Sequence, residues 1–263
     1  MFILNRLIPF IGSFLILLLW ELCFVKPRLI LVFGAGILMI VFLSFWRLFK
    51  HPIEGLSSAD KQGKDFWHFF CLPFLFIFSA FLFSIFLLSS HLFRHIFILT
   101  IVFLFYLILE SIFNFLYRPN VYQTHSIESF FSYLNLLTLF FLSSSFYNLI
   151  FFLNISFWLF LIFFFFVALF LSFYFFWVNK ILSKENVLYI LIITLILTEF
   201  FWIISFLPTN FYVNSLILML IYYLMVVSSK YCILKILNKK SIRQYLIVAG
   251  IAFLLVLLTA QWR

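Results

Sequence analysis

The amino-acid sequence predicts an all-α protein, a bundle of about nine helices that cross a membrane. Three observations predict this fold class: 67% of the 263 residues are hydrophobic, 10% are charged, and the apolar residues form long uninterrupted runs. A soluble domain is usually about 45–50% apolar and about 25% charged, and part of any soluble fold must face water. The composition therefore excludes a soluble enzyme, a nucleic-acid-binding module, a disordered chain and a secreted disulfide scaffold.

The length of the apolar runs indicates helices and not strands. Strands of membrane barrels are short and alternate apolar with polar residues, whereas residues 149–178 contain no charged residue. A helix needs roughly 20 apolar residues to cross a bilayer core, and it satisfies its own backbone hydrogen bonds, as lipid requires. We therefore expect a single integral membrane domain over residues 1–263, with no separate soluble domain.

Nine spans are expected, and polar or helix-breaking residues separate them. They cover 7–25, 29–46, 66–90, 96–117, 129–147, 154–178, 187–207, 211–230 and 244–261. Proline and asparagine in the intervening segments end helices for backbone reasons. The boundary between the fifth and sixth spans carries the weakest signals, which are Ser143-Ser144-Ser145, Asn148 and Asn154.

The distribution of basic residues predicts the orientation of the bundle. With nine spans, all of the 17 Lys and Arg residues except Lys26, Arg28, Arg94 and Arg263 lie on the side that holds the N-terminus. Lys and Arg concentrate on the cytoplasmic side of membrane proteins. We therefore expect the N-terminus in the cytoplasm and the C-terminus outside. Attraction to anionic lipids accounts for the net charge of +9, so no nucleic-acid partner is expected.

Tryptophan residues support the same span ends. Five of the seven fall near a predicted end, namely Trp20, Trp46, Trp67, Trp177 and Trp262. Because indole rings are amphipathic, they prefer the headgroup zone. We expect these five rings at the membrane surfaces.

Polar residues inside the spans are the first candidates for a functional site, because a charged group in hydrocarbon is costly. Glu110, Asn114 and Arg118 follow at steps of four and share one face of the fourth span. A similar stripe opens the fifth span and consists of Glu128, Ser132 and Asn135. A short cytoplasmic loop joins these spans, so we expect the two stripes to meet. The favoured interpretation is a polar clamp between helices, and the alternative is a cavity open to the cytoplasm.

Glu199 is the most conspicuous single candidate, because its own span contains no basic residue. At the rise of an α-helix it lies roughly 12 Å below the outer surface. An ionised carboxylate that faces hydrocarbon costs about 2.5–3.5 kcal/mol. We therefore expect Glu199 to turn into the bundle, where it is paired with another span or protonated. Glu21 lies closer to the outer surface, where snorkelling accounts for it.

His91 and His95 are the weak metal-ligand candidates. They stand four residues apart, a spacing that puts both rings on one face of a helix. No H-E-x-x-H pattern is present and no third ligand follows nearby, so a solvated loop is the favoured interpretation. The three cysteines are scattered and form no C-x-x-C pair. We expect no metal and no cofactor.

The stretch 202–214 reads Trp-Ile-Ile-Ser-Phe-Leu-Pro-Thr-Asn-Phe-Tyr-Val-Asn. It resembles a stretch that recurs in an uncharacterised group of small bacterial multi-pass membrane proteins, and the resemblance covers the last three spans. It implies an integral protein of the bacterial cytoplasmic (inner) membrane. The group brings no known activity to this chain.

Absent motifs shape the functional expectation. The sequence contains no G-x-x-x-x-G-K, G-x-G-x-x-G or G-x-S-x-G pattern and no Asp-rich motif for a metal–diphosphate. The favoured interpretation is a non-enzymatic accessory or scaffold subunit, whose partners are membrane lipids and other membrane proteins. The alternative is a transporter or lipid-handling protein with a polar intramembrane cavity. An intramembrane enzyme is the third interpretation.

Overall fold

The computed structural model describes residues 2–50, 59–86, 90–117, 126–153 and 156–234, together with Ile247 and Gly250. Eight helices in this part of the chain are long and apolar enough to cross a membrane, and no strand occurs there. The expected all-α fold is therefore confirmed for the described residues, and these eight helices are suited to crossing a membrane. The ninth expected span, 244–261, lies outside the described residues apart from Ile247 and Gly250. The number of spans and the orientation stay predictions.

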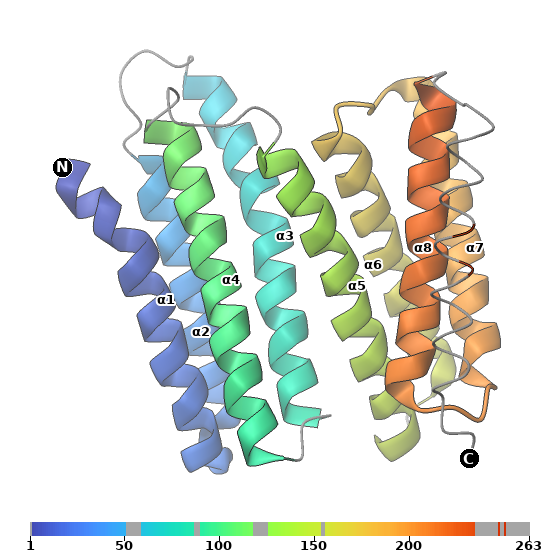
Figure 1. The fold of residues 1–263 in the computed structure, drawn as a ribbon, viewed down its shortest axis with the longest axis horizontal. Coiled ribbons are helices and arrows are strands. Elements are labelled where there is room, and N and C mark those ends of the chain that lie inside the picture. Colours follow the sequence, from blue (N-terminus) through green and yellow to red (C-terminus); the bar gives the residue numbers. More distant parts are fainter. Residues whose placement is uncertain are drawn as a thin grey trace. The chain divides into compact units, whose positions relative to one another are not determined.

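The chain divides into two compact units, Met1–Phe130 and Phe131–Arg263. The first unit holds α1 (Phe2–Val25), α2 (Ile30–Lys50), α3 (Ala59–Phe86) and α4 (His91–Tyr117). The second unit holds nearly all of α5 (Ser126–Leu153), then α6 (Phe157–Val178), α7 (Val187–Ser205) and α8 (Phe211–Ile233) (Figure 1). The single membrane domain expected from the sequence stays a prediction.

The four helices of the first unit form a closed ring of contacts. Helix α1 packs against α2 and α4, and α3 packs against the same two helices. Gly12 lets α1 and α2 approach closely, because a Cβ atom there would lie 2.6 Å from Oγ of Ser44 on α2. Small residues at helix contacts allow close packing in lipid, where no hydrophobic driving force joins two helices.

In the second unit, α7 packs against both α6 and α8. Helix α6 ends in a Schellman motif, in which the backbone N–H of Ile181 donates to the carbonyl of Phe176 at 3.1 Å and that of Lys180 donates to Trp177 at 3.0 Å. The motif requires a left-handed residue, and Lys180 supplies it with a φ of 58°. Helix α6 therefore ends at Val178, the residue at which the predicted sixth span ends.

The predicted boundary between the fifth and sixth spans is wrong in part. Ser143, Ser144 and Ser145 do not interrupt a helix but lie fully buried inside α5, which continues to Leu153. The hydroxyls of Ser143 and Ser145 donate to the carbonyls four residues earlier, those of Leu139 and Phe141. Because this internal bond satisfies the hydroxyls of Ser143 and Ser145, both residues are compatible with a helix in lipid. The buried hydroxyl of Ser144 has no hydrogen-bond partner among the described residues.

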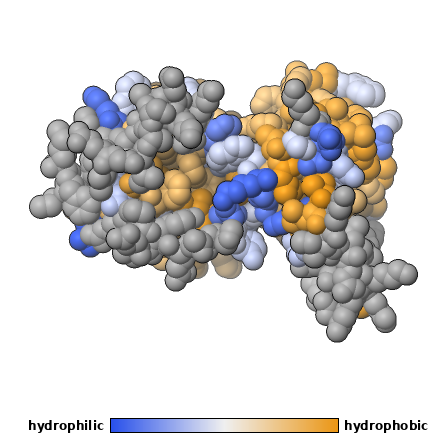
Figure 2. Space-filling model, turned by 90° about the horizontal axis from the view of Figure 1, so that it is seen from above, coloured by the Kyte–Doolittle hydropathy of each residue, from blue (hydrophilic) through white to orange (hydrophobic). Residues whose placement is uncertain are grey.

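Large apolar side chains are exposed along the helices and not only buried between them. Examples are Leu31 at 85%, Phe206 at 74% and Phe151 at 68% exposure. Figure 2 shows apolar side chains at the outer surface of the helices and hydrophilic ones among those at the end facing the viewer. A soluble protein avoids such extensive apolar surface, so the described helices are suited to a lipid environment.

Candidate functional site

A hydrogen-bonded group in the middle of the second unit joins three helices. The Asn135 side chain on α5 donates through Nδ2 to the carbonyl of Leu171 on α6 at 2.9 Å. Its Oδ1 atom accepts from the hydroxyl of Tyr222 on α8 at 3.5 Å. Asn135 is 1% exposed and Tyr222 is fully buried. The one amide therefore links α5 to both α6 and α8, and both of its polar ends have partners.

A stacked group of aromatic rings holds α5, α6 and α7 together. The Phe201 ring on α7 stacks on Phe164 of α6, with 4.2 Å between ring centroids, and on Tyr147 of α5 at 4.6 Å. The hydroxyl of Tyr147 donates to the carbonyl of Phe201 at 3.0 Å. Aromatic pairs of this kind contribute about 0.5–1.5 kcal/mol beyond their buried area. Ring stacking and a hydrogen bond therefore both stabilise the contact between α5 and α7.

Three buried threonine hydroxyls of the second unit are satisfied within their own helix. Thr194 donates to the carbonyl of Ile190 and Thr198 donates to that of Thr194, at 2.8 and 2.7 Å. Thr138 on α5 donates to the carbonyl of Leu134 in the same way. These bonds remove the cost of a bare hydroxyl in an apolar interior. The polar side chains described so far have structural roles.

The orientation expected for Glu199 is not found. Its side chain is exposed on α7 and does not point into the second unit. Thr194 and Thr198, together with Leu197 and Phe201, form the buried face of the helix. Glu199 follows Thr198 by one residue, which turns it by about 100° away from that face. The two threonines, and not the glutamate, mark the inward side of α7.

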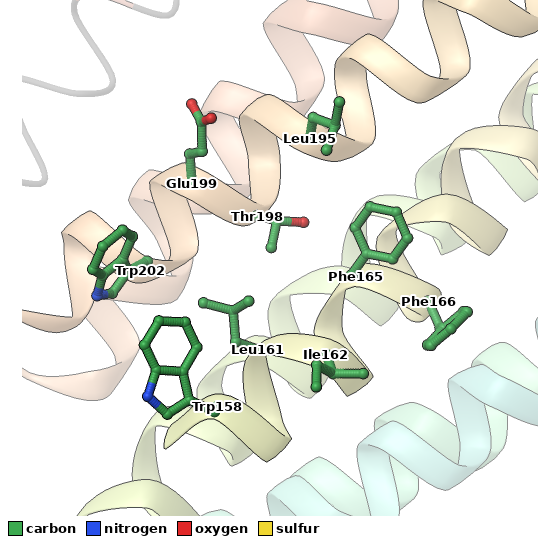
Figure 3. A pocket seen from close by; sticks show the side chains of 9 residues that line it. All are labelled: Trp158, Leu161, Ile162, Phe165, Phe166, Leu195, Thr198, Glu199 and Trp202. Carbon is green, nitrogen blue, oxygen red and sulfur yellow. The ribbon is translucent and has the colours of Figure 1, made fainter. Parts of the chain in front are cut away.

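Glu199 stands at the edge of a groove between α6 and α7 with a volume of about 410 Å³. Helix α6 contributes a ridge formed by Trp158, Ile162 and Phe166, and α7 contributes Leu195 and Trp202. The two indole rings lie 6.1 Å apart. Figure 3 shows the Glu199 carboxylate directed away from the side chains of α6. The wall of the groove is apolar, and the carboxylate lies on its rim.

The predicted meeting of two polar stripes stays a prediction. Glu110 and Asn114 are half-buried on α4 of the first unit, and Arg118 lies outside the described residues. On α5, Glu128 and Ser132 are half-buried and Asn135 is buried. The partners that the structure gives to Asn135 belong to α6 and α8.

A second polar group lies where α1 ends and α4 begins. The side chains of Glu21 and His95 are in hydrogen-bond contact, with 2.9 Å between Oε1 and Nδ1. Arg94 donates to Nδ1 of His91 at 2.6 Å, and its guanidinium lies 4.0 Å from the centroid of the Phe24 ring. His91 and His95 lie in the first two turns of α4, whereas the sequence predicted a solvated loop. Because the side chains of Glu21 and His95 are 31% and 50% exposed, their contact contributes about 0–1 kcal/mol.

This arrangement gives the two histidines separate partners. Within the described residues, no group of three or more His, Cys, Asp and Glu side chains is placed to hold a metal ion. The sequence attributed Glu21 to snorkelling and did not predict its pairing with His95. The sequence did contain a signal for this contact. Glu21 is acidic and His95 is basic, and both lie near the outer ends of the first and fourth predicted spans.

Two further polar contacts were not expected from the sequence. Lys230, near the end of α8, donates to Oδ1 of Asn179 at 2.6 Å and so joins the ends of α8 and α6. Thr209 donates to the side chain of Asn214 across the turn before α8. The bond of Tyr222 was not predicted either, although a tyrosine in the middle of a span needs a partner for its hydroxyl.

No protein-family model, curated protein or solved structure matches this chain. The resemblance to a bacterial group therefore stays a prediction.

Proposed function

We propose that this protein is a non-enzymatic accessory or scaffold subunit of a bacterial cytoplasmic membrane, which acts by binding other membrane proteins. The observation that supports the proposal most is the Asn135 group. Its amide is used to join α5, α6 and α8, with Tyr222 as a partner. Polar groups whose hydrogen bonds join helices stabilise a rigid bundle, as a scaffold requires. A catalytic site instead needs acid, base or nucleophile groups that converge on a cavity.

The exposed side chains of the second unit support the same proposal. Glu199 lies on the surface of a membrane-spanning helix among large apolar side chains. A carboxylate at such a place is costly in lipid, at about 2.5–3.5 kcal/mol on insertion scales. A binding partner that covers it would remove this cost.

Native membrane extraction tests the proposal. In mild detergent, the chain of 31.6 kDa is expected to migrate in a complex with a second membrane protein in fixed stoichiometry. Deletion of the chain is expected to lower the amount of that second protein, because an orphaned membrane subunit is degraded. Isolation of the chain alone, together with solute or lipid transfer in vesicles that Asn135→Leu abolishes, would instead establish the transport alternative.

The orientation is a separate proposal, with the N-terminus inside and the C-terminus outside. After replacement of Cys23, Cys71 and Cys232 by serine, single cysteines are introduced at Ala59 and at Arg263. A membrane-impermeant thiol reagent applied from outside is expected to label Arg263→Cys and to leave Ala59→Cys unmodified until the membrane is opened. Labelling of both positions from the same side would contradict the nine-span topology.

A further inference from the structure

The exposed face of α7 carries a regular stripe of large side chains. The stripe consists of Leu188, Ile192, Leu195, Glu199 and Trp202 on α7 and of Phe206 directly after its end. These residues follow at alternating steps of four and three, and all are exposed. The apolar members are between 43% and 74% exposed. Alternating steps of four and three define the seam by which one helix packs on another in a left-handed crossing. The stripe therefore has the geometry of a helix-binding face.

From this stripe and the acidic side chain within it, we infer that α7 binds a transmembrane helix of a partner protein, and that a Lys or Arg of that helix pairs with Glu199. The inference rests on the proposed accessory function and identifies the surface that performs it. The ridge of Trp158, Ile162 and Phe166 on α6 borders the same face and forms the second wall against which the partner helix lies.

The length of the stripe favours a helix over a lipid. From residue 188 to residue 206 an α-helix rises about 27 Å, which is close to the full thickness of the hydrocarbon core. A single lipid covers one leaflet only. Glu199 also lies six residues before the end of α7 at Ser205, or about 9 Å below it, whereas lipid ammonium groups stay at the headgroup level.

Charge complementarity favours a basic partner over a second copy of this chain. In a parallel dimer with two-fold symmetry, the same face of each copy meets the other, so Glu199 would lie opposite Glu199. Two carboxylates at one site repel each other unless they share a proton. A single polar residue in an apolar seam instead selects the partner and its register through its counterpart on the other helix.

Model peptides test this inference on the whole protein. The purified full chain carries a donor fluorophore in phosphatidylcholine vesicles. Leucine-based transmembrane peptides of about 20 residues carry the acceptor. One peptide has a single lysine at the depth of Glu199, and its match has leucine there. Energy transfer is expected to show about 3- to 20-fold tighter association of the lysine peptide, which is the range of polar contacts between membrane helices.

Three variants assign the effect to Glu199. Glu199→Gln is expected to abolish the preference for the lysine peptide, and Glu199→Lys is expected to transfer it to a peptide with glutamate at that position. Glu110→Gln is the matched control, because it removes a half-buried carboxylate from α4 of the first unit. It should leave the preference unchanged. Equal binding of the lysine and leucine peptides, or a preference that survives Glu199→Gln, would overturn the inference.

Other occupants of the face give different results. A photo-reactive residue at Leu195 that cross-links to residues 244–263 of the same chain would show that the chain covers its own face. A cross-link between two copies would likewise overturn the inference. If the native complex forms but the lysine peptide shows no preference, the accessory function stands and the partner binds another surface.

Discussion

Phe201→Ala is expected to lower the free energy of unfolding by about 3 kcal/mol, which is a large part of a typical total stability. The Phe201 ring is fully buried, and it stacks on Phe164 and Tyr147, with 4.2 and 4.6 Å between centroids. Its removal leaves a cavity where α5, α6 and α7 meet. The loss falls at the low end of the usual range of about 3–5 kcal/mol for a buried phenylalanine, because an unfolded membrane chain stays in an apolar solvent and loses packing only.

Unfolding by sodium dodecyl sulfate, followed by tryptophan fluorescence, measures the effect. Ile203→Ala is the matched control on the same helix, since Ile203 is 57% exposed and its truncation should change stability by less than about 0.5 kcal/mol. Tyr147→Phe keeps the stacked ring but removes the bond to the Phe201 carbonyl. This variant should lie between the other two. Equal losses for Phe201→Ala and Ile203→Ala would contradict the packing described for the second unit.

The positions of the helices could be predicted from the sequence because lipid imposes a simple rule. Each span needs a long apolar run, and polar or helix-breaking residues must stand between runs. Eight of the nine predicted spans correspond to helices, and α7 begins at Val187 as predicted. The rule fails at Ser143-Ser144-Ser145, where the hydroxyls of Ser143 and Ser145 bond to carbonyls of their own helix and then tolerate burial.

The inward faces of the helices could not be predicted in the same way. In a soluble protein, the apolar stripe of a helix marks its buried side. Helix α7 is apolar on all sides, so Glu199 provided the only strong contrast, and the cost of its burial suggested an inward orientation. In the structure the inward face of α7 contains Thr194 and Thr198 instead. Both can be buried because their hydroxyls donate to carbonyls of the same helix.

Whether the candidate polar residues form a functional site stays a prediction, and among them Asn135 has partners that the sequence did not reveal. Asn135 was a candidate, and it is buried with both ends of its amide bonded. Its partners are a backbone carbonyl on α6 and a tyrosine on α8. The sequence does not reveal which carbonyl lies opposite a side chain, since this depends on how the helices cross. Because α4 and α5 follow each other along the chain, α4 was expected to contact Asn135. The order of the helices does not indicate contacts with α6 or α8.

Trp20 shows that a ring near the end of a span can have its hydrogen-bond partner inside the protein. Its position near the end of the first span predicted a ring in the headgroup zone. In the structure Trp20 is fully buried in the first unit. Its indole Nε1 donates to the hydroxyl of Ser84 on α3 at 3.0 Å, and its ring meets that of Phe81 edge to face at 5.7 Å. A hydroxyl on a neighbouring helix replaces the headgroup as hydrogen-bond partner.

Trp20→Ala is therefore expected to destabilise the first unit by about 3 kcal/mol, since it leaves a cavity and removes the hydrogen bond between α1 and α3. Cys23 reports this effect directly, because it lies on the same helix and is fully buried. If its thiol reacts only when the unit opens, its modification in the variant should be roughly 100-fold faster than in the native protein.

Two variants separate the causes of this change. Ser84→Ala removes the hydroxyl and keeps the indole ring, so it should accelerate the modification of Cys23 by about threefold, the average value of one polar contact between membrane helices. Trp46→Ala removes a ring that is 53% exposed on α2 and should leave the rate unchanged. If Trp46→Ala and Trp20→Ala accelerate the reaction equally, Trp20 lies at the membrane surface, as its sequence position predicts, and the packing of α1 on α3 through this ring is wrong.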